Sequence, residues 1–355
     1  MMKKLIPIIL LGAAAIVAGC SSGDRTSATL TGWSFNPDMI FPADRSLNRP
    51  EDGVALQDGR VVVADQADGL RIVSADGSSR PFGKFADAGY VHNPPETVGG
   101  PNGVTLEPAG THILVADVFR GGLYRVDITT EATELVYQHQ FGINMARGDR
   151  SGGIWFTQST QNKPEQGERD LFRSVDIPTP DGALYYLPPR NGGESCVAVP
   201  LVEGLSFANG LVLDETGGYL YMAETMAGRV LRYRLDVQAG RVTDQTVALE
   251  GVKPDNLELD RHNRLWIANL VRNEIVVLNL ATGTAQSVFR ISTPKSEQVI
   301  SEIESRIREG KSWVKLLSPP LWEPSPGPIT GFVLSADDGP VYVTGLGNAL
   351  IQLKR

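Results

Sequence analysis

Six residues at matching positions of a repeated segment carry the side chains best suited to bind a metal ion in this chain. Each copy of the segment has a polar or glycine start, a short alternating apolar run, a turn rich in Gly, Asp or Asn, and a second apolar run. Asn and Asp are common turn formers, so any one of these positions alone is explained by local structure. At five of the six positions the side chain is a carboxylate or a carboxamide, and this agreement indicates a metal-binding site. The opening residues are Glu51 or Asp52, Asn102, Asn144, Asn209, Asp255 and Thr330.

The donor atoms of this set favour calcium. Two carboxylates and two or three carboxamides are hard oxygen ligands, and no His or Cys shares their register. Ca²⁺ accepts about six to eight oxygens in irregular geometry, whereas Mg²⁺ retains waters and requires a stricter octahedron. We therefore predict one axial Ca²⁺, with another divalent cation as the alternative. Its remaining positions suit water or a substrate carbonyl.

Short antiparallel strands are the elements that must hold these residues. A third apolar run follows every segment, as in GGLYRVD (121–127) and NEIVVLN (273–279). Short alternating runs separated by Gly-Asp turns are typical of strands. Six copies of one β-meander, each too small to bury its own faces, predict an all-β chain closed into a six-bladed β-propeller. Closure would gather the opening residues around one axis.

Two insertions interrupt the repeat. Residues 159–181 are polar and contain Pro, which predicts a long loop inside the third blade. Residues 293–328 predict an amphipathic helical insertion before the last blade, with Ser296 as its N-cap, followed by a Pro-rich segment. We expect this insertion to cover the metal-bearing end as an apolar lid; the alternatives are a helix on the flank or on a membrane. The apolar residues are Val299, Ile300, Ile303 and Ile307 in the helix, then Trp313, Leu316, Leu317 and Trp322.

The N-terminus resembles a bacterial lipoprotein signal. Lys3 and Lys4 precede an apolar stretch too short to span a membrane, and the stretch ends in Val-Ala-Gly before Cys20. We expect a signal peptide over 1–19, acylation of Cys20, a flexible tether over 20–31 and the propeller over 32–355. This predicts an exported, membrane-anchored protein on the periplasmic side, in the outer membrane if the cell is Gram-negative. An ordinary secretory signal is the alternative.

Composition narrows the class of protein further. The net charge of −8 argues against a nucleic-acid partner. After lipidation only Cys196 remains, so no intramolecular disulfide is expected and stability must come from the core. We expect one large domain that is a monomer.

Three motifs resemble the senescence-marker-protein/gluconolactonase family, with paraoxonase-like features. They are PNGVTLEPAGTHILVADVFRGGLYRVD (101–127), ANGLVLDETGGYLYMAE (208–224) and PDNLELDRHNRLWIAN (254–269), and the resemblance runs from about residue 45 to 355. It implies a six-bladed propeller with an axial calcium that hydrolyses lactones and esters. The ligands that it implies are Glu51, Asn144, Asn209 and Asp255, with Asn256 as an additional ligand or a neighbour of the ligands.

The chain departs from this pattern in two places. Paraoxonases have a His proposed as general base at the second-blade position, where this chain has Asn102. We therefore expect Asp255 to accept a proton from a metal-bound water, with Asn102 assisting catalysis; His139 is the weaker candidate near the mouth. Strict alignment of the repeats pairs Asp52, rather than Glu51, with Asn102, which leaves the first-blade ligand open.

Together these residues predict calcium-dependent hydrolysis of a lactone or related ester, a small-molecule substrate. One alternative is a non-catalytic, ligand-binding lipoprotein with a structural calcium, because propellers host many functions. The other is a strictosidine-synthase-like enzyme without a metal, against which the full set of oxygen ligands argues.

Overall fold

The computed structural model describes residues 30, 32–163, 171–190, 196–335 and 339–354. The expected signal peptide, Cys20 and all of the expected tether except Leu30 lie outside these residues. Within the described ranges, no helix is both long enough and apolar enough to cross a membrane.

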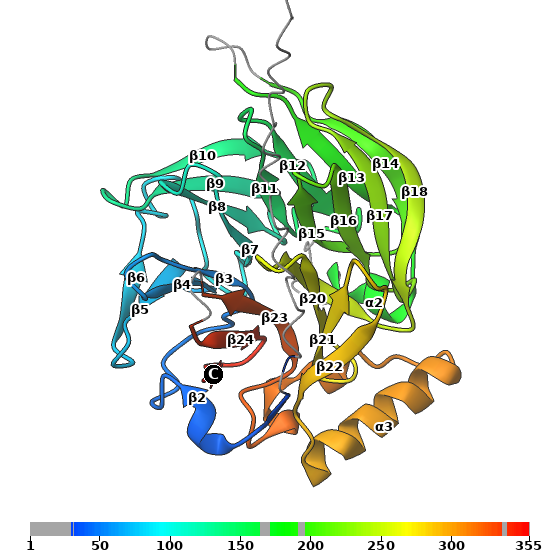
Figure 1. The fold of residues 1–355 in the computed structure, drawn as a ribbon. Helices are drawn as coiled ribbons and strands as arrows, with labels where there is room; N and C mark the ends of the chain where they lie inside the picture. The colour runs from blue at the N-terminus through cyan, green and yellow to red at the C-terminus, as the bar shows by residue number, and fades with distance from the viewer. Residues whose placement is uncertain (1–29, 31, 164–170, 191–195, 336–338, 355) are drawn as a thin grey trace, which may run out of the picture. The chain divides into compact units, whose positions relative to one another are not determined.

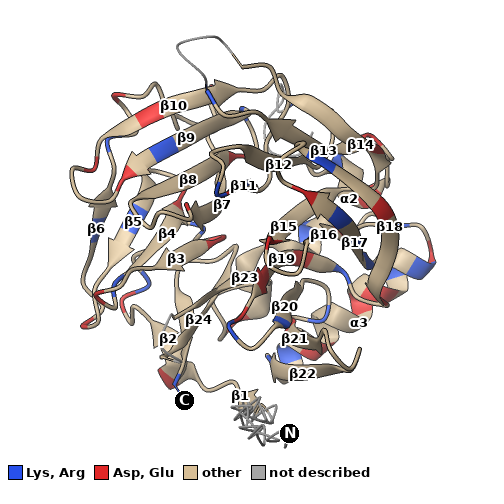
Figure 2. Cartoon of the chain, turned by 45° about the horizontal axis from the view of Figure 1, so that its top comes forward, with Lys and Arg blue, Asp and Glu red and all other residues tan. Residues whose placement is uncertain are grey.

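Six sheets surround a common centre and form a six-bladed β-propeller, as the sequence predicted (Figures 1 and 2). Blade 1 contains β3 (Gly53–Ala55), β4 (Val61–Asp65), β5 (Gly69–Val73) and β6 (Ser79–Phe82). Blade 2 contains β7 (Pro101–Leu106), β8 (His112–Asp117), β9 (Gly122–Asp127) and β10 (Thr133–Gln138). Blade 3 contains β11 (Ala146–Gly148), β12 (Ile154–Gln158), β13 (Gly182–Leu187) and β14 (Val199–Leu205).

The last three blades continue this meander. Blade 4 contains β15 (Ala208–Asp214), β16 (Tyr219–Glu224), β17 (Arg229–Asp236) and β18 (Arg241–Glu250). Blade 5 contains β19 (Pro254–Leu259), β20 (Arg264–Asn269), β21 (Glu274–Asn279) and β22 (Ala285–Arg290). Blade 6 contains β23 (Ile329–Leu334), β24 (Val341–Gly345) and β25 (Leu350–Leu353).

Two strands near the N-terminus complete the outer edges of blades 5 and 6. β2 (Ile40–Phe41) pairs antiparallel with β25 and supplies the fourth strand of blade 6. β1 (Trp33–Ser34) pairs parallel with β22 as a fifth strand of blade 5, and the short 3-10 helix η1 (Pro37–Met39) lies between the two. The first and last parts of the described chain therefore share one sheet, which closes the ring.

Apolar side chains between neighbouring blades form the core. The alternating strand residues that the sequence marked as apolar are buried, and one cluster joins blades 1 and 2 through Val62, Ile113 and Tyr124. A second cluster joins blades 3 and 4 around the fully buried Trp155. Because each blade buries its faces against its neighbours, a single blade has no complete core.

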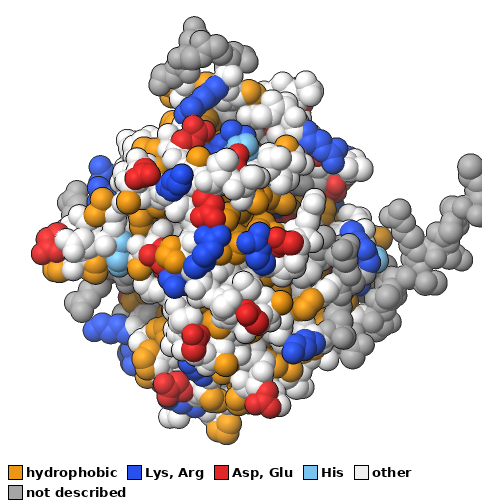
Figure 3. Space-filling view, turned by 90° about the vertical axis from the view of Figure 1, so that its left-hand side faces the viewer, with side chains coloured by type: hydrophobic (Ala, Val, Ile, Leu, Met, Phe, Trp, Pro, Cys, Tyr) orange, Lys and Arg blue, Asp and Glu red, His pale blue; other side chains and the backbone are white. Residues whose placement is uncertain are grey.

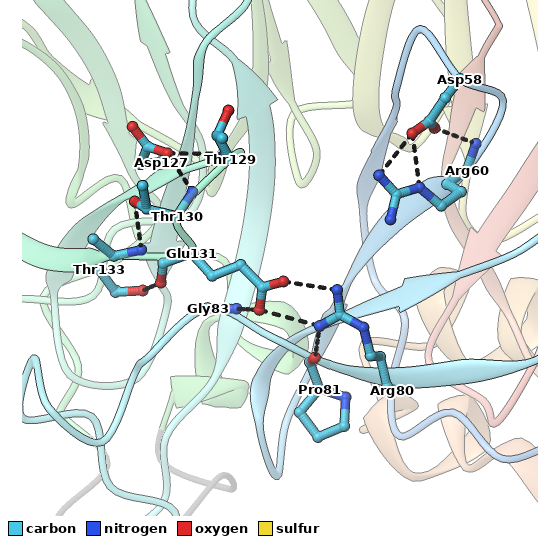
Figure 4. A network of polar contacts seen from close by, with 11 residues as sticks. Asp58, Arg60, Arg80, Pro81, Gly83, Asp127, Thr129, Thr130, Glu131 and Thr133 are labelled. Carbon is cyan, nitrogen blue, oxygen red and sulfur yellow. Dashed lines mark hydrogen bonds and ion pairs between the residues drawn. The ribbon is translucent and has the colours of Figure 1, made fainter.

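Polar contacts add to these packed interfaces at the rim. Arg80 in β6 forms a two-pronged ion pair with Glu131 of blade 2, at 2.7 and 3.1 Å, and Glu131 also accepts a bond from Gly83 N (Figure 4). Bidentate Arg–carboxylate pairs are directional, so this contact links the two blades at their rim. Figure 3 shows one face of the molecule, where acidic and basic side chains are interspersed.

The two insertions contain the other helices of the described chain. Residues 159–181 contain the short α2 (Arg173–Asp176), and the second insertion contains α3 (Pro294–Arg308), η2 (Val314–Leu317) and η3 (Pro319–Trp322). The predicted N-cap Ser296 is wrong. Thr293 is the N-cap, and Ser296 occupies the third helical position, where the two side chains form a reciprocal capping box. Val299, Ile300 and Ile303 are buried as predicted, but Ile307 is exposed.

Candidate metal centre

The register of the blades brings the predicted axial residues to equivalent places. Asn102, Asn209 and Asp255 are each the second residue of an inner strand, two positions before the residue at which regular pairing resumes. Thr330 is also the second residue of its strand, but regular pairing resumes there at the next residue, Gly331. Glu51 lies equally two positions before Gly53, which pairs with Val63. Glu51, not Asp52, is therefore the register equivalent of Asn102. The alignment of the repeats was one residue off because it matched the Gly-Val pairs of the first two blades.

A local break in strand pairing accompanies the axial residue in blades 2, 4, 5 and 6. The register of the inner strand shifts there, next to Asn102, Asn209, Asp255 and Thr330. Such bulges release a residue from the ladder and redirect its side chain. The glycine that follows two of these residues permits a close approach of the next blade. A Cβ at Gly103 would lie 2.8 Å from Asn144 O, and one at Gly210 would lie 2.6 Å from Asn256 Cα.

One buried cavity collects most of the predicted ligands. Its polar lining includes Glu51, Asn102, Asn144, Asn209 and Asp255, which are each at most 5% exposed, together with Thr330. Figure 2 shows the six inner strands around the centre. The cavity volume is about 40 Å³. That volume suits an ion with one or two waters, whereas ligand pockets begin at roughly 300 Å³.

Burial raises the pKa of the carboxyl groups at this centre. Loss of solvent raises the pKa of Glu51, although the nearby Arg49 charge lowers it. Burial raises the pKa of Asp255 well above its ordinary value, and repulsion from Glu51 raises it further. Arg49 offsets only part of the cost of two ionised carboxylates here, and a divalent cation would offset more of it.

Unpartnered amide oxygens provide a second observation that fits a cation. Asn209 Oδ1 and Asn256 Oδ1 are both buried and accept no hydrogen bond. Buried polar atoms in native proteins are normally paired. These two oxygens have no partner in the protein, and a bound cation would supply one. Among the described residues no group of three or more His, Cys, Asp and Glu side chains forms a metal cluster. The centre therefore depends on amide oxygens, and its donors fit Ca²⁺ better than a thiolate- or imidazole-preferring metal.

Arg49 is a functional candidate that the sequence reasoning missed. Its side chain lines the cavity. The guanidinium donates one hydrogen bond to Asn102 Oδ1 at 3.0 Å and another to Pro101 O at 3.3 Å. Its backbone φ of 55° lies in the left-handed region, which is uncommon for a residue with a Cβ. Nothing in the repeat pattern marks it, because it lies in the connection before blade 1.

An apolar roof built from both insertions completes the cavity. Phe172 and Val175 from the first insertion and Trp313 and Leu317 from the second line it. Asp176 joins the two insertions: its carboxylate accepts bonds from Ser312 Oγ, Trp313 N and Val314 N at 2.6–3.0 Å. The second insertion therefore covers the ligand end of the propeller, as expected, and the first insertion helps. Leu316 and Trp322 pack in the cluster behind this roof.

Three predicted or considered residues lie elsewhere. Asp52 does not line the cavity; its Oδ2 accepts a bond from Val104 N at 2.9 Å, between blades 1 and 2. Asn256 lies beside Glu51, at 3.4 Å between Nδ2 and Oε2, without lining the cavity itself. His139 is buried in an aromatic cluster with Tyr185 and Phe156, and is bonded to Gln158 rather than to the centre.

Comparison with known proteins relates the chain to lactonases and to strictosidine synthase-like proteins. Lactonase drp35 of Staphylococcus aureus is 26% identical over 37% of this chain and 36% of its own length. Protein STRICTOSIDINE SYNTHASE-LIKE 7 of Arabidopsis thaliana is 26% identical over 62% of this chain and 56% of its own length. The chain spans about a third to a half of the length of the curated relatives it matches.

Solved structures show the same fold. A gluconolactonase from Xanthomonas campestris superimposes with a TM-score of 0.59 at 17% identity, covering 87% of both chains. Regucalcin from Agrobacterium tumefaciens, a calcium-binding protein, gives a TM-score of 0.54 at 16% identity, covering 89% of this chain and 87% of that one.

The family model of the SMP-30/Gluconolactonase/LRE-like region matches residues 138–301, from the end of blade 2 into α3. The match includes Asn144, Asn209 and Asp255, three of the residues that line the cavity. The resemblance that the sequence motifs carried is thereby confirmed: the chain is similar to the SMP-30/gluconolactonase-like family over residues 138–301.

Proposed function

We propose that this protein is a calcium-dependent hydrolase of a lactone or a related ester. The observation that carries the proposal is that two buried, pKa-raised carboxyl groups share one cavity with the unpartnered amide oxygen of Asn209. Glu51, Asn144, Asn209 and Asp255 would hold the ion, with Asn256 supporting Glu51. When bound, the ion would polarise a carbonyl and lower the pKa of a water molecule.

The residues of the cavity divide the remaining work. Asp255 is the proposed acceptor of the proton that water loses on attack, because its carboxylate lines the cavity in which that water would lie. Arg49 and the Asn102 amide are the donors placed to orient the substrate carbonyl oxygen and to stabilise its negative charge.

The apolar roof indicates the substrate class. Phe172, Val175, Trp313 and Leu317 offer no hydrogen bonds to sugar hydroxyls through their side chains, whereas an acyl chain would pack against them. We therefore propose a lipophilic lactone as substrate. Since the cavity holds about 40 Å³, the roof must move for such a molecule to enter.

Two other functions remain as rivals. A ligand-binding propeller with a structural calcium would use the same residues without turnover. A strictosidine-synthase-like activity has a named relative among the similar proteins, but the donor set at the axis favours the calcium enzyme.

Asp255→Asn tests the calcium-dependent hydrolase. The variant keeps the size of the side chain but removes a charged ligand and the base, so calcium affinity should fall on the order of 100-fold and turnover should be lost. Calorimetry with Ca²⁺ and hydrolysis of aliphatic lactones, before and after chelation, measure the two effects. Calcium binding by the wild-type protein without hydrolysis of any lactone would favour the ligand-binding propeller with a structural calcium. An absence of stoichiometric calcium would contradict the metal centre.

We also propose that the chain is exported and anchored through acylated Cys20. The proposal depends on the signal-like order of residues 3–20. Mass spectrometry of the native protein should find a lipidated Cys20 as the first residue, and Cys20→Ser should abolish it. A mature N-terminus without lipid would contradict the anchor.

A further inference from the structure

Two buried hydroxyl groups occupy equivalent positions beside the two axial asparagines of blades 3 and 4. Ser159 directly follows β12, and Thr225 directly follows β16, both second strands of their blades. Each is at most 2% exposed. Asn144 Nδ2 lies 3.0 Å from Ser159 Oγ, and Asn209 Nδ2 lies 3.1 Å from Thr225 Oγ1. The same contact is therefore made twice, one blade apart.

Each hydroxyl also reaches the next blade. Ser159 Oγ is 2.8 Å from Ala208 O, and Thr225 Oγ1 is 2.6 Å from Pro254 O. A backbone carbonyl only accepts hydrogen bonds, so each hydroxyl must donate its single proton there. Toward the asparagine the hydroxyl can then only accept. The carboxamide atom that faces the hydroxyl must therefore be the nitrogen, which places the oxygen on the opposite edge of the carboxamide.

We infer that Ser159 and Thr225 are positioning residues that fix the carboxamides of Asn144 and Asn209 with their oxygens toward the axis. This inference rests on the proposed calcium site, and it identifies what makes an asparagine there a ligand. A carboxamide turned by half a rotation would present N–H donors to a cation. The unpartnered state of Asn209 Oδ1 agrees with this orientation.

Blade 2 provides an internal comparison. Its axial residue is also an asparagine, Asn102, but Val118 stands at the position of the hydroxyl. Arg49 instead donates to Asn102 Oδ1, and an arginine has no acceptor. The Asn102 nitrogen is therefore on the edge away from Arg49 and lies 3.3 Å from Asn144 Oδ1. The asparagine without a hydroxyl neighbour is thus the one turned as a donor, which separates it from the two ligands.

Thr225→Val tests the inference, because it keeps the shape of the side chain and removes the hydroxyl. We expect calcium affinity, measured by calorimetry on the whole protein, to fall about 10–100-fold, the effect typical of residues that orient ligands. Ser159→Ala should act similarly, and Thr225→Ser should restore the affinity. Thr105→Val is the matched control: Thr105 Oγ1 donates to Ala146 O of the next blade at 2.7 Å but contacts no axial amide. It should leave the affinity unchanged.

A double-mutant cycle separates orientation from structural damage. A carboxylate has an oxygen on both edges, so Asn209→Asp needs no orienting partner. Thr225→Val should therefore cost nothing in calcium affinity in the Asn209→Asp background. An equal loss in both backgrounds, or no loss in either, would overturn the inference.

Neutron diffraction of the ion-free wild-type protein provides a readout that needs no metal. It should place the two deuterons of each amide on the edge facing Ser159 or Thr225; deuterons on the opposite edge would overturn the inference. Failure of wild type to bind calcium would instead contradict the proposed function, whatever the amide orientation.

Discussion

Arg49 places a permanent positive charge beside a centre that is proposed to bind a cation. Its guanidinium lies close enough to lower the pKa of Glu51 and holds the Asn102 oxygen at 3.0 Å. A cation at this place weakens metal binding, and its left-handed backbone is a further cost. Such costs persist where a residue has a function, and the function proposed for Arg49 is to bind a substrate oxygen that becomes negative.

Arg49→Met should separate these two effects. Removing the charge should tighten calcium binding several-fold, because repulsion with the ion is lost. Loss of the donor should lower kcat/KM for a lactone on the order of 10–100-fold. Calorimetry and steady-state kinetics measure the two changes, and Arg49→Lys is the control that keeps the charge. Unchanged kinetics in Arg49→Met would exclude Arg49 from the reaction.

Sequence reasoning found the axial residues because repetition exposes them. Asn144, Asn209 and Asp255 recur at one register, so their convergence follows once the blades are recognised. Ser159 and Thr225 carry no such signal, since a hydroxyl after a strand is ordinary in type. Aligning the Gly-Val pairs of blades 1 and 2 matches Asp52 with Asn102, whereas the observed strand pairing matches Glu51 with Asn102. The sequence alone does not display this difference of one residue.

At the scale of elements, the sequence predicted three strands per blade and missed the outer fourth. β18 shows why: most of its side chains are exposed, so no apolar alternation marks it. β2 is only two residues long and completes a blade whose other strands lie some 300 residues later. Edge strands that are polar, such as β18, or very short, such as β2, are defined by their partners, and a single sequence does not display those partners.

The roof is the element whose movement should govern substrate choice. Leu317 in η2 lines the cavity, whereas Ile300 in α3 is buried in the same apolar cluster without lining it. Either residue changed to Ala should cost about 2–5 kcal/mol of stability. Leu317→Ala alone should lower the KM for long-chain lactones relative to short ones, since it enlarges the space beneath the roof.

Thermal unfolding and a series of lactones of increasing chain length check this prediction. An equal change of substrate preference in Ile300→Ala and Leu317→Ala would mean that the roof acts only through stability. No change of preference in a folded Leu317→Ala would mean that substrate does not contact η2.

At the scale of the whole molecule, closure of the ring depends on β2. Its two residues pair with Leu350 and Ile351, and Phe41 packs near Tyr342 at 5.7 Å between ring centroids. A chain beginning at residue 46 would leave β25 as an open edge, with a loss of roughly 3 kcal/mol from hydrogen bonds and buried apolar surface. A chain beginning at residue 37 removes only β1, the fifth strand of a complete blade, and should lose much less. Urea unfolding of the two truncations compares the losses, and equal losses would contradict a special role for β2.

Calcium and pH should act together on the stability of the ring. Burial raises the pKa of Glu51, Asp52 and Asp255, which hold protons in the ion-free folded state that the unfolded chain releases. Stability of ion-free protein should therefore fall as the pH rises from the ordinary values of 3.8 for Asp and 4.5 for Glu through the raised values. Bound calcium would neutralise Glu51 and Asp255 as carboxylates and remove most of that loss.

The difference in Tm between calcium-loaded and calcium-stripped protein should consequently widen as the pH increases above about 4. Calorimetric unfolding at a series of pH values measures it, with Asp255→Asn as the variant in which the difference should nearly vanish. A constant Tm difference across this range would mean that calcium binds without displacing protons from these carboxyl groups. The ion would then have to lie away from Glu51 and Asp255, which would contradict the proposed axial calcium site.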